Sequence, residues 1–457
     1  INLWEPRIVY KDKELPQPNV PDVVFNIDIS NPPMVNVTHS SSRPPLFDPR
    51  LAFAKITLPQ PPTPTTQAAG PGGLPFPLRS EQLQFGVAAH LFYTERDTPL
   101  AMAREAGCDA FLTKPYDADT LQLVFSSTKG VTAACAHLLV QRGLLDLDAP
   151  VAQYWPEFAA AGKEALPVRW LLTHEAGLVD VDRPMTLDEA LDWDVVTAAL
   201  AASAALWEPG TGYGYHAVTF GWLVGEVVRR VSGMDFGDFV QREIAGPLGL
   251  DLWVGLPDEQ QSRVAPLTAS AVAAEDLAAL DDAAGSDVAQ MSLVEALDAL
   301  LGKGNLLGRA LVAPGGALED DAVWNDERVR SAQIPAANGV TNAASLARFY
   351  ASLVSDVDGF RLLDAATLDA AIEPQVSGAS LVPLLDIPFS LGFMTHSANS
   401  PLLGGRSFGH YGAGGSLGFA DPDRQLAGGY VMNVTQIAVA GDPRTAGLLA
   451  AVDQVVN

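Results

Sequence analysis

Residues 124–158 read VFSSTKGVTAACAHLLVQRGLLDLDAPVAQYWPEF, and this stretch carries the strongest structural signal in the chain. The run Thr120–Phe125 (TLQLVF) predicts a β-strand that ends at a serine. Ser126–Gly143 has apolar residues on a repeating face and ends in a glycine, which predicts a helix. Residues three apart share a helix face, so Ser126 and Lys129 are expected to touch.

The pair Ser126 and Lys129 has the spacing of a nucleophile and its base. A serine hydroxyl is a weak nucleophile and needs a base beside it. A lysine accepts a proton only when neutral, so its pKa must fall from about 10.4 to about 7–8, at a cost of roughly 4 kcal/mol. Burial and the positive end of a helix both favour the neutral amine. The structural alternative is a helix-capping serine followed by an exposed lysine.

Four further segments follow in a fixed order: VRWLLTHEAGL at 168–178, PGTGYGYHA at 209–217, ANGVTN at 337–342 and FGHYG at 408–412. Together with residues 124–158 they resemble the serine β-lactamase-like superfamily. The resemblance is strongest to its class C branch and to the family VIII carboxylesterases. It covers about Phe85–Asn457 and is lost over roughly the first 80 residues.

The resemblance implies roles for individual residues. Ser126 matches the acylated nucleophile and Lys129 matches its partner base. Tyr215 matches the tyrosine that shuttles a proton between the nucleophile and the leaving group. The family also implies an oxyanion hole made by the backbone N–H groups of Ser126 and Ala413. Such donors typically change a rate by about 10²–10³-fold.

Two positions depart from the β-lactamase pattern. Ala217 stands where the family has the asparagine of Tyr-x-Asn, which helps hold the side-chain amide of a β-lactam. His410-Tyr411-Gly412 stands where the family has Lys-Thr-Gly, and we expect these three residues to bind substrate. A histidine is mostly neutral at pH 7. The exchange therefore favours a neutral ester over an anionic lactam.

The expected function is that of a serine hydrolase, a carboxylesterase that cleaves short-chain esters through an acyl-serine intermediate. A β-lactamase, a D-amino peptide hydrolase or an acyltransferase of the same fold is the alternative. A scaffold or assembly protein that kept the fold without the chemistry is the non-enzyme alternative. We expect a small-molecule ester as the substrate, no cofactor and no metal, and homo-oligomer formation is left open.

Strands before and after a helical block predict an α/β (α+β) protein of the β-lactamase/transpeptidase-like fold. Its antiparallel sheet would be flanked by helices, and an all-helical domain would be inserted. The expected α/β domain combines residues 80–143 and 330–457, with the helical domain at 144–329. Residues 1–79 form a Pro-rich N-terminal extension with 16 of the 34 prolines. Within it, Val23–Ile27 could add a strand to a sheet edge.

Charge and hydropathy limit the partners and the location. Lys and Arg number 28 against 54 Asp and Glu, which gives a net charge of −26. Binding to nucleic acid or to an anionic membrane needs a basic surface, so neither partner is expected. No apolar run is long enough to span a bilayer. No signal peptide is visible, so a cytoplasmic location is expected, although the chain begins with Ile1 and its N-terminus is treated as incomplete.

Three other motifs are weaker. Gly414–Gly418 matches the G-x-S-x-G nucleophile elbow around Ser416, but the residues after it predict a strand and no histidine follows. His174-Glu175 begins an H-E-x-x-H pattern, but position 178 is a leucine, so no zinc site is expected. Residues 103–121 resemble the end of a response-regulator receiver domain, but the acidic residues that a receiver needs upstream are missing.

Overall fold

The computed structural model describes residues 119–269, 301–435 and 440–456, and before them the backbone of four strands. These strands are β1 (Val23–Asp28), β2 (Met34–His39), β3 (Ala54–Thr57) and β4 (Val87–Tyr93). Most of the receiver-like stretch 103–121 therefore lies outside the described residues.

The strand predicted at Val23–Ile27 forms, but its place in a sheet was predicted wrongly. It is β1, the middle strand of a three-stranded sheet with the order β2-β1-β3, and not an addition to an edge. Its sequence VVFNID contains no proline. Both edges of the strand therefore keep the N–H groups that pairing on two sides requires.

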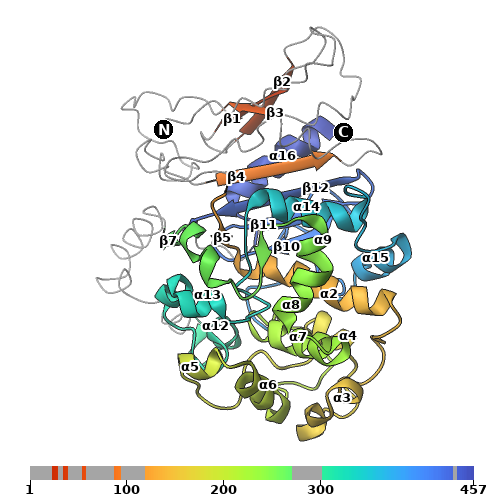
Figure 1. The fold of residues 1–457 in the computed structure, drawn as a ribbon, viewed down its shortest axis with the longest axis vertical. Helices are drawn as coiled ribbons and strands as arrows, with labels where there is room; N and C mark the ends of the chain where they lie inside the picture. Colours follow the sequence, from red (N-terminus) through yellow and green to blue (C-terminus); the bar gives the residue numbers. More distant parts are fainter. Residues whose placement is uncertain are drawn as a thin grey trace.

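The largest sheet has five antiparallel strands in the order β4-β12-β11-β10-β9 (Figure 1). Strand β4 pairs along its full length with β12, more than 300 residues later. The chain after residue 388 supplies the other members. These are β9 (Met394–Thr395), β10 (Phe408–Tyr411), β11 (Leu417–Asp421) and β12 (Leu426–Met432).

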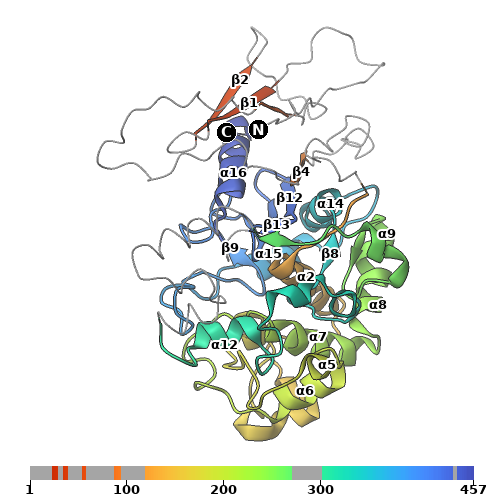
Figure 2. The ribbon, with the colours of Figure 1, turned by 90° about the vertical axis from the view of Figure 1, so that its left-hand side faces the viewer.

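Helices cover both faces of this sheet. Helix α14 (Ala343–Val354) and helix α16 (Pro443–Val456) lie on opposite sides of β12 (Figure 2). Helix α14 comes close because the sheet presents glycines to it. A Cβ on Gly429 would lie 2.6 Å from the carbonyl oxygen of Ala343, and one on Gly418 would lie 2.2 Å from the ring of Tyr350. These two glycines therefore set the distance between helix and sheet.

The predicted helical block forms between β5 and β8, with the long helix α7 buried at its centre. Helix α7 is Thr219–Ser232 and ends at Gly233, whose φ of 69° is the left-handed conformation that glycine commonly adopts after a helix. The other helices of the block are α3 (Val151–Tyr154), α4 (Arg169–Leu172), α5 (Leu187–Ala190), α6 (Trp193–Ala202), α8 (Phe236–Val240), α9 (Gly246–Leu248), α12 (Leu306–Val312) and α13 (Glu327–Ser331), with the shorter turns η4 (Pro156–Gly162), η5 (Gln241–Ala245), η6 (Asp258–Arg263) and η8 (Asp321–Asn325).

The block is not wholly helical, which corrects that part of the prediction. It contains β6 (Leu252–Trp253) and β7 (Thr268–Ala269). Strand β6 joins β5 (Gln122–Leu123) and β8 (Val340–Thr341) in the order β5-β8-β6, and β7 pairs with β13 (Val434–Thr435). These two-residue strands satisfy backbone groups where the block meets the α/β body. The domain boundaries themselves stay a prediction.

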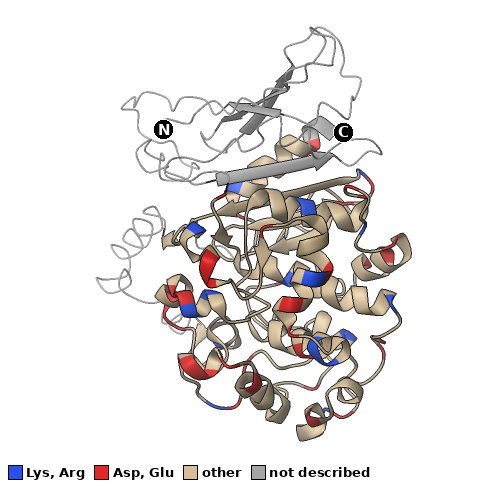
Figure 3. Ribbon diagram, viewed as in Figure 1, with Lys and Arg blue, Asp and Glu red and all other residues tan. Residues whose placement is uncertain are grey.

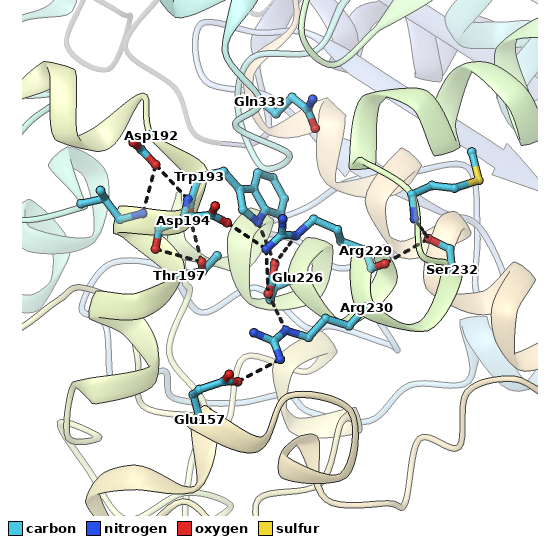
Figure 4. Close-up of polar contacts among 12 residues, drawn as sticks. Glu157, Asp192, Trp193, Asp194, Thr197, Glu226, Arg229, Arg230, Ser232 and Gln333 are labelled. Carbon is cyan, nitrogen blue, oxygen red and sulfur yellow. Dashed lines mark hydrogen bonds and ion pairs between the residues drawn. The ribbon is translucent and has the colours of Figure 1, made fainter.

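The buried carboxylate of Glu226 ties three parts of the helical block together (Figure 4). It accepts hydrogen bonds from Nε1 of Trp193 at 2.7 Å, from Arg229 at 2.7 Å and from Arg230 at 2.6 Å. Arg230 also pairs with Glu157 at 2.9 Å. Burial alone would raise the pKa of Glu226, but these donors hold it below its usual value. All of these groups find partners within the cluster, so it is a structural cluster.

The charged residues of the described part are dispersed. Blue Lys and Arg segments alternate with red Asp and Glu segments over the helical block in this view (Figure 3). Many of them pair directly, as in Arg328 with Asp188 and Arg406 with Asp369. Among the described residues, no helix combines the length and the apolar character needed to cross a bilayer.

Candidate active site

The turn between β5 and helix α2 (Thr128–Gln141) presents Ser126. The predicted strand–helix junction forms here, through the short helix η3 (Phe125–Ser127). Phe125 has a φ of 43°, a left-handed conformation that a bulky residue rarely adopts. Such strain persists only where surrounding contacts hold it, and it is common beside reactive groups. Ser126 follows directly and keeps 8% of its surface exposed.

Lys129 is the best-defined group of the site. It is fully buried, and its Nζ has three neighbours: Oγ of Ser126 at 2.9 Å and the carbonyl oxygens of Ala217 at 2.6 Å and Ala336 at 3.0 Å. A neutral amine has two N–H groups and one lone pair. The two carbonyls accept the two N–H groups, and the lone pair then faces the Ser126 hydroxyl.

Burial also supplies the protonation state that this geometry needs. It lowers the pKa of Lys129 well below its usual value, because charging the amine in a closed apolar site is unfavourable. The ring of Tyr215 lies beside the amine, with Nζ 4.9 Å from its centroid. A neutral amine in this arrangement has the chemistry to accept the proton of Ser126.

A second buried lysine shows what a structural lysine looks like in the same chain. Lys163 donates to three carbonyl oxygens, those of Ala160, Ala201 and Ser203. All three hydrogens of an ammonium group are thus used. At Lys129 a hydroxyl takes the place of the third carbonyl, and this difference distinguishes the two sites.

Tyr215 comes to the site from the loop before α7. Its side chain is buried, and its ring stacks on Phe389 with centroids 5.7 Å apart and on His410 at 6.1 Å. Its hydroxyl makes no hydrogen bond of normal geometry to the described residues. Burial raises its pKa, and the nearby Ser126 hydroxyl lowers it in part. Tyr215 is therefore a protonated phenol next to Ser126, free to exchange a proton with a bound molecule.

His410 lies on β10 and faces Tyr215. It is fully buried, and its Nδ1 lies 2.6 Å from the carbonyl oxygen of Tyr411. Burial lowers the pKa of His410 well below 6.5, so the ring is neutral. The structure thus brings Ser126, Lys129, Tyr215 and His410 together.

Tyr411 points to the other face of β10, because side chains alternate along a strand. Its hydroxyl donates to the carbonyl oxygen of Pro401 at 2.5 Å. What Tyr411 contributes near the site is its carbonyl group, which accepts the hydrogen bond from His410. A direct substrate contact by the Tyr411 side chain is not supported by this placement.

Gly412 brings the end of β10 against the nucleophile turn. A Cβ there would lie 2.2 Å from the carbonyl oxygen of Val124 and 2.2 Å from Oγ of Ser416. Ala413 follows directly and is partly exposed. The structure shows no acceptor for the amide of Ser126 or of Ala413 among the described backbone and side-chain groups. Both N–H groups therefore remain available on adjacent turns.

Ser416, the serine of the G-x-S-x-G pattern, is a structural residue. It is buried, and its Oγ donates to the carbonyl oxygen of Val124 at 2.6 Å and lies 3.0 Å from Oγ of Ser127. It precedes β11 and not a helix. Ser416 thereby joins the turn after β10 to the turn before Ser126.

His174 and His216 pack behind Tyr215. The ring centroids of His174 and Tyr215 are 5.1 Å apart. His216 Nδ1 contacts the carbonyl oxygen of Gly214 at 2.7 Å, and its Nε2 accepts from the amide of Leu178 at 2.9 Å. Burial lowers the pKa of His216 to about 3, so it is neutral. Within the described residues no group of three or more His, Cys, Asp or Glu could hold a metal ion.

Three contributors to the site escaped the sequence analysis. The carbonyl groups of Ala217 and Ala336 are invisible there, because every residue carries one. Phe389 stacks on Tyr215, but nothing in its neighbourhood marked it. Asn338 gives an indirect signal: its side chain accepts from the amide of Ile334 and donates to Val329 and Ala332, which fixes the loop that carries Ala336.

A buried lysine against a serine hydroxyl is the geometry expected of a serine hydrolase, and the comparison with known proteins places the chain in such a family. The model of the family described as "Beta-lactamase" matches residues 101–452. This match covers most of the chain, and the chain belongs to the β-lactamase family. The predicted β-lactamase/transpeptidase-like fold is thereby confirmed.

The similar proteins include enzymes named as esterases. Esterase/beta-lactamase LipL of Mycobacterium tuberculosis is 36% identical over 330 residues, which cover 70% of each chain. The structure of EstA from Arthrobacter nitroguajacolicus is 30% identical, with a TM-score of 0.68 over 81% of this chain and 92% of that one. A family VIII carboxylesterase structure is 32% identical, with a TM-score of 0.63 over 75% of this chain and 85% of that one. The predicted class, a carboxylesterase-type hydrolase, is confirmed at this level.

Proposed function

We propose that this enzyme hydrolyses short-chain carboxylic esters through an acyl-enzyme on Ser126. The single observation that carries the proposal is the environment of Lys129. Two carbonyl groups take its N–H groups, and its remaining contact is Ser126 Oγ at 2.9 Å. A buried lysine in this arrangement serves as a base, because it is neutral and directed at a hydroxyl.

The proposed reaction uses these groups in the following steps. Ser126 Oγ attacks the ester carbonyl carbon while its proton passes to Nζ of Lys129. The negative charge that develops on the carbonyl oxygen is stabilised by the N–H groups of Ser126 and Ala413. Tyr215 gives a proton to the departing alcohol oxygen and is reprotonated from Lys129. Water then attacks the acyl-serine, and the same groups carry its proton back to Ser126 Oγ.

Two features favour esters over β-lactams as substrates. Ala217 has no side-chain amide, and its backbone carbonyl is already bonded to Lys129. His410 is a buried, neutral ring and presents no positive charge to a substrate carboxylate. The names of similar proteins include both esterases and β-lactamases. The experiment below therefore tests the β-lactamase alternative directly.

The test measures hydrolysis of p-nitrophenyl butyrate and of nitrocefin by the wild type, Ser126→Ala and Ser416→Ala. The wild type is expected to cleave the ester and to cleave nitrocefin slowly or not at all. A fluorophosphonate should label the wild type and Ser416→Ala but not Ser126→Ala, since Ser416 is buried in structural contacts.

Each alternative has its own signature. Fast nitrocefin turnover would assign the enzyme to the β-lactamases. Ester turnover or labelling that survives in Ser126→Ala would refute the nucleophile. A wild type that takes up no label and cleaves neither compound would favour the scaffold function.

A further inference from the structure

Nε2 of His410 is a buried polar atom that the proposed mechanism does not use. The His410 side chain is fully buried, and its Nε2 has no hydrogen-bond partner among the described residues. A buried polar group without a partner is unfavourable and is uncommon in folded proteins. An orphaned atom beside a nucleophile therefore indicates a partner that arrives with the substrate.

The tautomer of His410 decides what kind of partner that is. Nδ1 lies 2.6 Å from the carbonyl oxygen of Tyr411. A carbonyl oxygen only accepts hydrogen bonds, so the proton must be on Nδ1. A neutral imidazole carries one proton, and Nε2 is then a lone-pair acceptor. The charged form, with a proton on each nitrogen, is disfavoured by complete burial.

The position of His410 decides which part of the substrate it meets. Its ring lies against the ring of Tyr215, with centroids 6.1 Å apart and planes 27° from parallel. Tyr215 is the residue that we assign to the leaving alcohol. His410 and Phe389 both flank that tyrosine. The partner of Nε2 therefore belongs to the alcohol portion of the ester and not to its acyl chain.

We propose that Nε2 of His410 accepts a hydrogen bond from a hydroxyl group on the alcohol portion, so that the preferred substrates are short-chain esters of alcohols that carry a second hydroxyl. The inference rests on the proposed ester hydrolysis and adds the substrate class. An acceptor lone pair attracts a hydroxyl, gains nothing from a methyl group and repels a carboxylate. Sites built to bond a substrate hydroxyl discriminate strongly against analogues that lack it.

The experiment compares three butyrate esters that differ at one position: 2-hydroxyethyl butyrate, propyl butyrate and the carboxymethyl ester of butyric acid. The measured quantity is kcat/KM, and each reaction is monitored through the release of butyrate. We expect the wild type to prefer the hydroxyethyl over the propyl ester by about tenfold or more, the usual effect of satisfying one buried acceptor. The carboxymethyl ester should be the poorest of the three.

Two variants separate recognition from intrinsic reactivity. His410→Phe removes the acceptor and keeps an aromatic ring against Tyr215, and its hydroxyethyl/propyl ratio gives the intrinsic reactivity of the two esters. His137→Phe is the matched control, because His137 is also buried but bonds the carbonyl oxygen of Leu391 and stacks on Phe393. The control should keep the wild-type ratio, whereas His410→Phe should lose it.

The outcomes are distinct. A wild-type ratio equal to that of His410→Phe, or near one if that variant does not fold, would overturn the inference and leave the esterase proposal intact. A wild type that is inactive on p-nitrophenyl butyrate and on all three esters would refute the proposed function itself, and the inference with it. A preference for the carboxymethyl ester would also overturn the inference, because it requires a cation at this position.

Discussion

Replacing Gly412 with alanine tests whether the contact between β10 and the nucleophile turn controls catalysis. The new Cβ would lie 2.2 Å from the carbonyl oxygen of Val124, 2.2 Å from Oγ of Ser416 and 3.2 Å from the amide nitrogen of Ser127. A carbon and an oxygen atom normally stay more than about 3 Å apart, so the turns must separate by roughly 1 Å. That movement separates the amides of Ser126 and Ala413.

The expected result is a loss of turnover greater than the loss of stability. Removing one oxyanion donor lowers kcat by about 10²–10³-fold, and we expect a decrease of that size for Gly412→Ala. Overpacking of this kind lowers the free energy of unfolding by about 1–3 kcal/mol, which leaves a folded enzyme to measure. Steady-state kinetics with p-nitrophenyl butyrate and urea unfolding monitored by circular dichroism give the two quantities.

Gly405→Ala is the control, because a Cβ on Gly405 meets nothing within 4 Å and its φ is not left-handed. It should change neither kcat nor stability. A folded Gly412→Ala enzyme with kcat within about threefold of the wild type would show that the two amides do not act as a pair, and would remove the oxyanion assignment.

Three further predictions concern buried titratable groups. Lys129→Met should lose ester hydrolysis, whereas Lys163→Met should keep the kcat of the wild type and unfold at a lower temperature, because only Lys129 contacts a hydroxyl. Burial lowers the pKa of His137 to about 4. Below pH 6.5 the unfolded chain therefore binds a proton that the folded protein excludes, and the free energy of unfolding decreases as the pH is lowered. Between pH 7 and pH 4 the wild type should lose about 3 kcal/mol more unfolding free energy than His137→Phe, and equal losses in urea titrations would contradict this. Glu226→Gln should cost about 3 kcal/mol of unfolding free energy in the same assay, against less than about 0.5 kcal/mol for Glu157→Gln, whose carboxylate is 64% exposed.

The parts of the fold that the sequence predicted well are those with local signals. The helix after Ser126 and helix α7 both stop where a glycine follows, and Gly143 and Gly233 both have left-handed φ values of 69°. Helix α16 begins at Pro443, and proline suits the first turn of a helix. In each case the boundary depends on one residue and its own backbone.

The parts that it missed depend on contacts between distant segments. Strands β6 and β7 are two residues long and exist only because β8 and β13 lie beside them. The position of β1 in its sheet depends on which strands pair with it. Pairing of this kind is not encoded in the strand's own periodicity, which reports only how its side chains alternate.

The candidate site divides in the same way. The spacing of Ser126 and Lys129 predicted their contact, and the structure shows it. The exchange at Ala217 suggested a lost function, whereas the structure shows that this residue contributes its carbonyl group to Lys129. Side-chain identity can be compared between family members, but backbone groups are the same in every sequence, so such a contribution becomes visible only in the fold.

The hydrogen bonds of Lys129 also determine when the chain becomes active during its own folding. The lysine lies on the helix that follows β5, one of its carbonyl partners comes from the helical block at Ala217, and the other comes from the return segment at Ala336. Until all three segments have come together, the amine is exposed to water and protonated, and Ser126 lacks the base that we propose for it. In a nascent or partly folded chain Ser126 is therefore an unreactive serine. Under the proposed mechanism, hydrolytic activity appears only with the complete tertiary structure. Measured turnover therefore indicates that folding is complete.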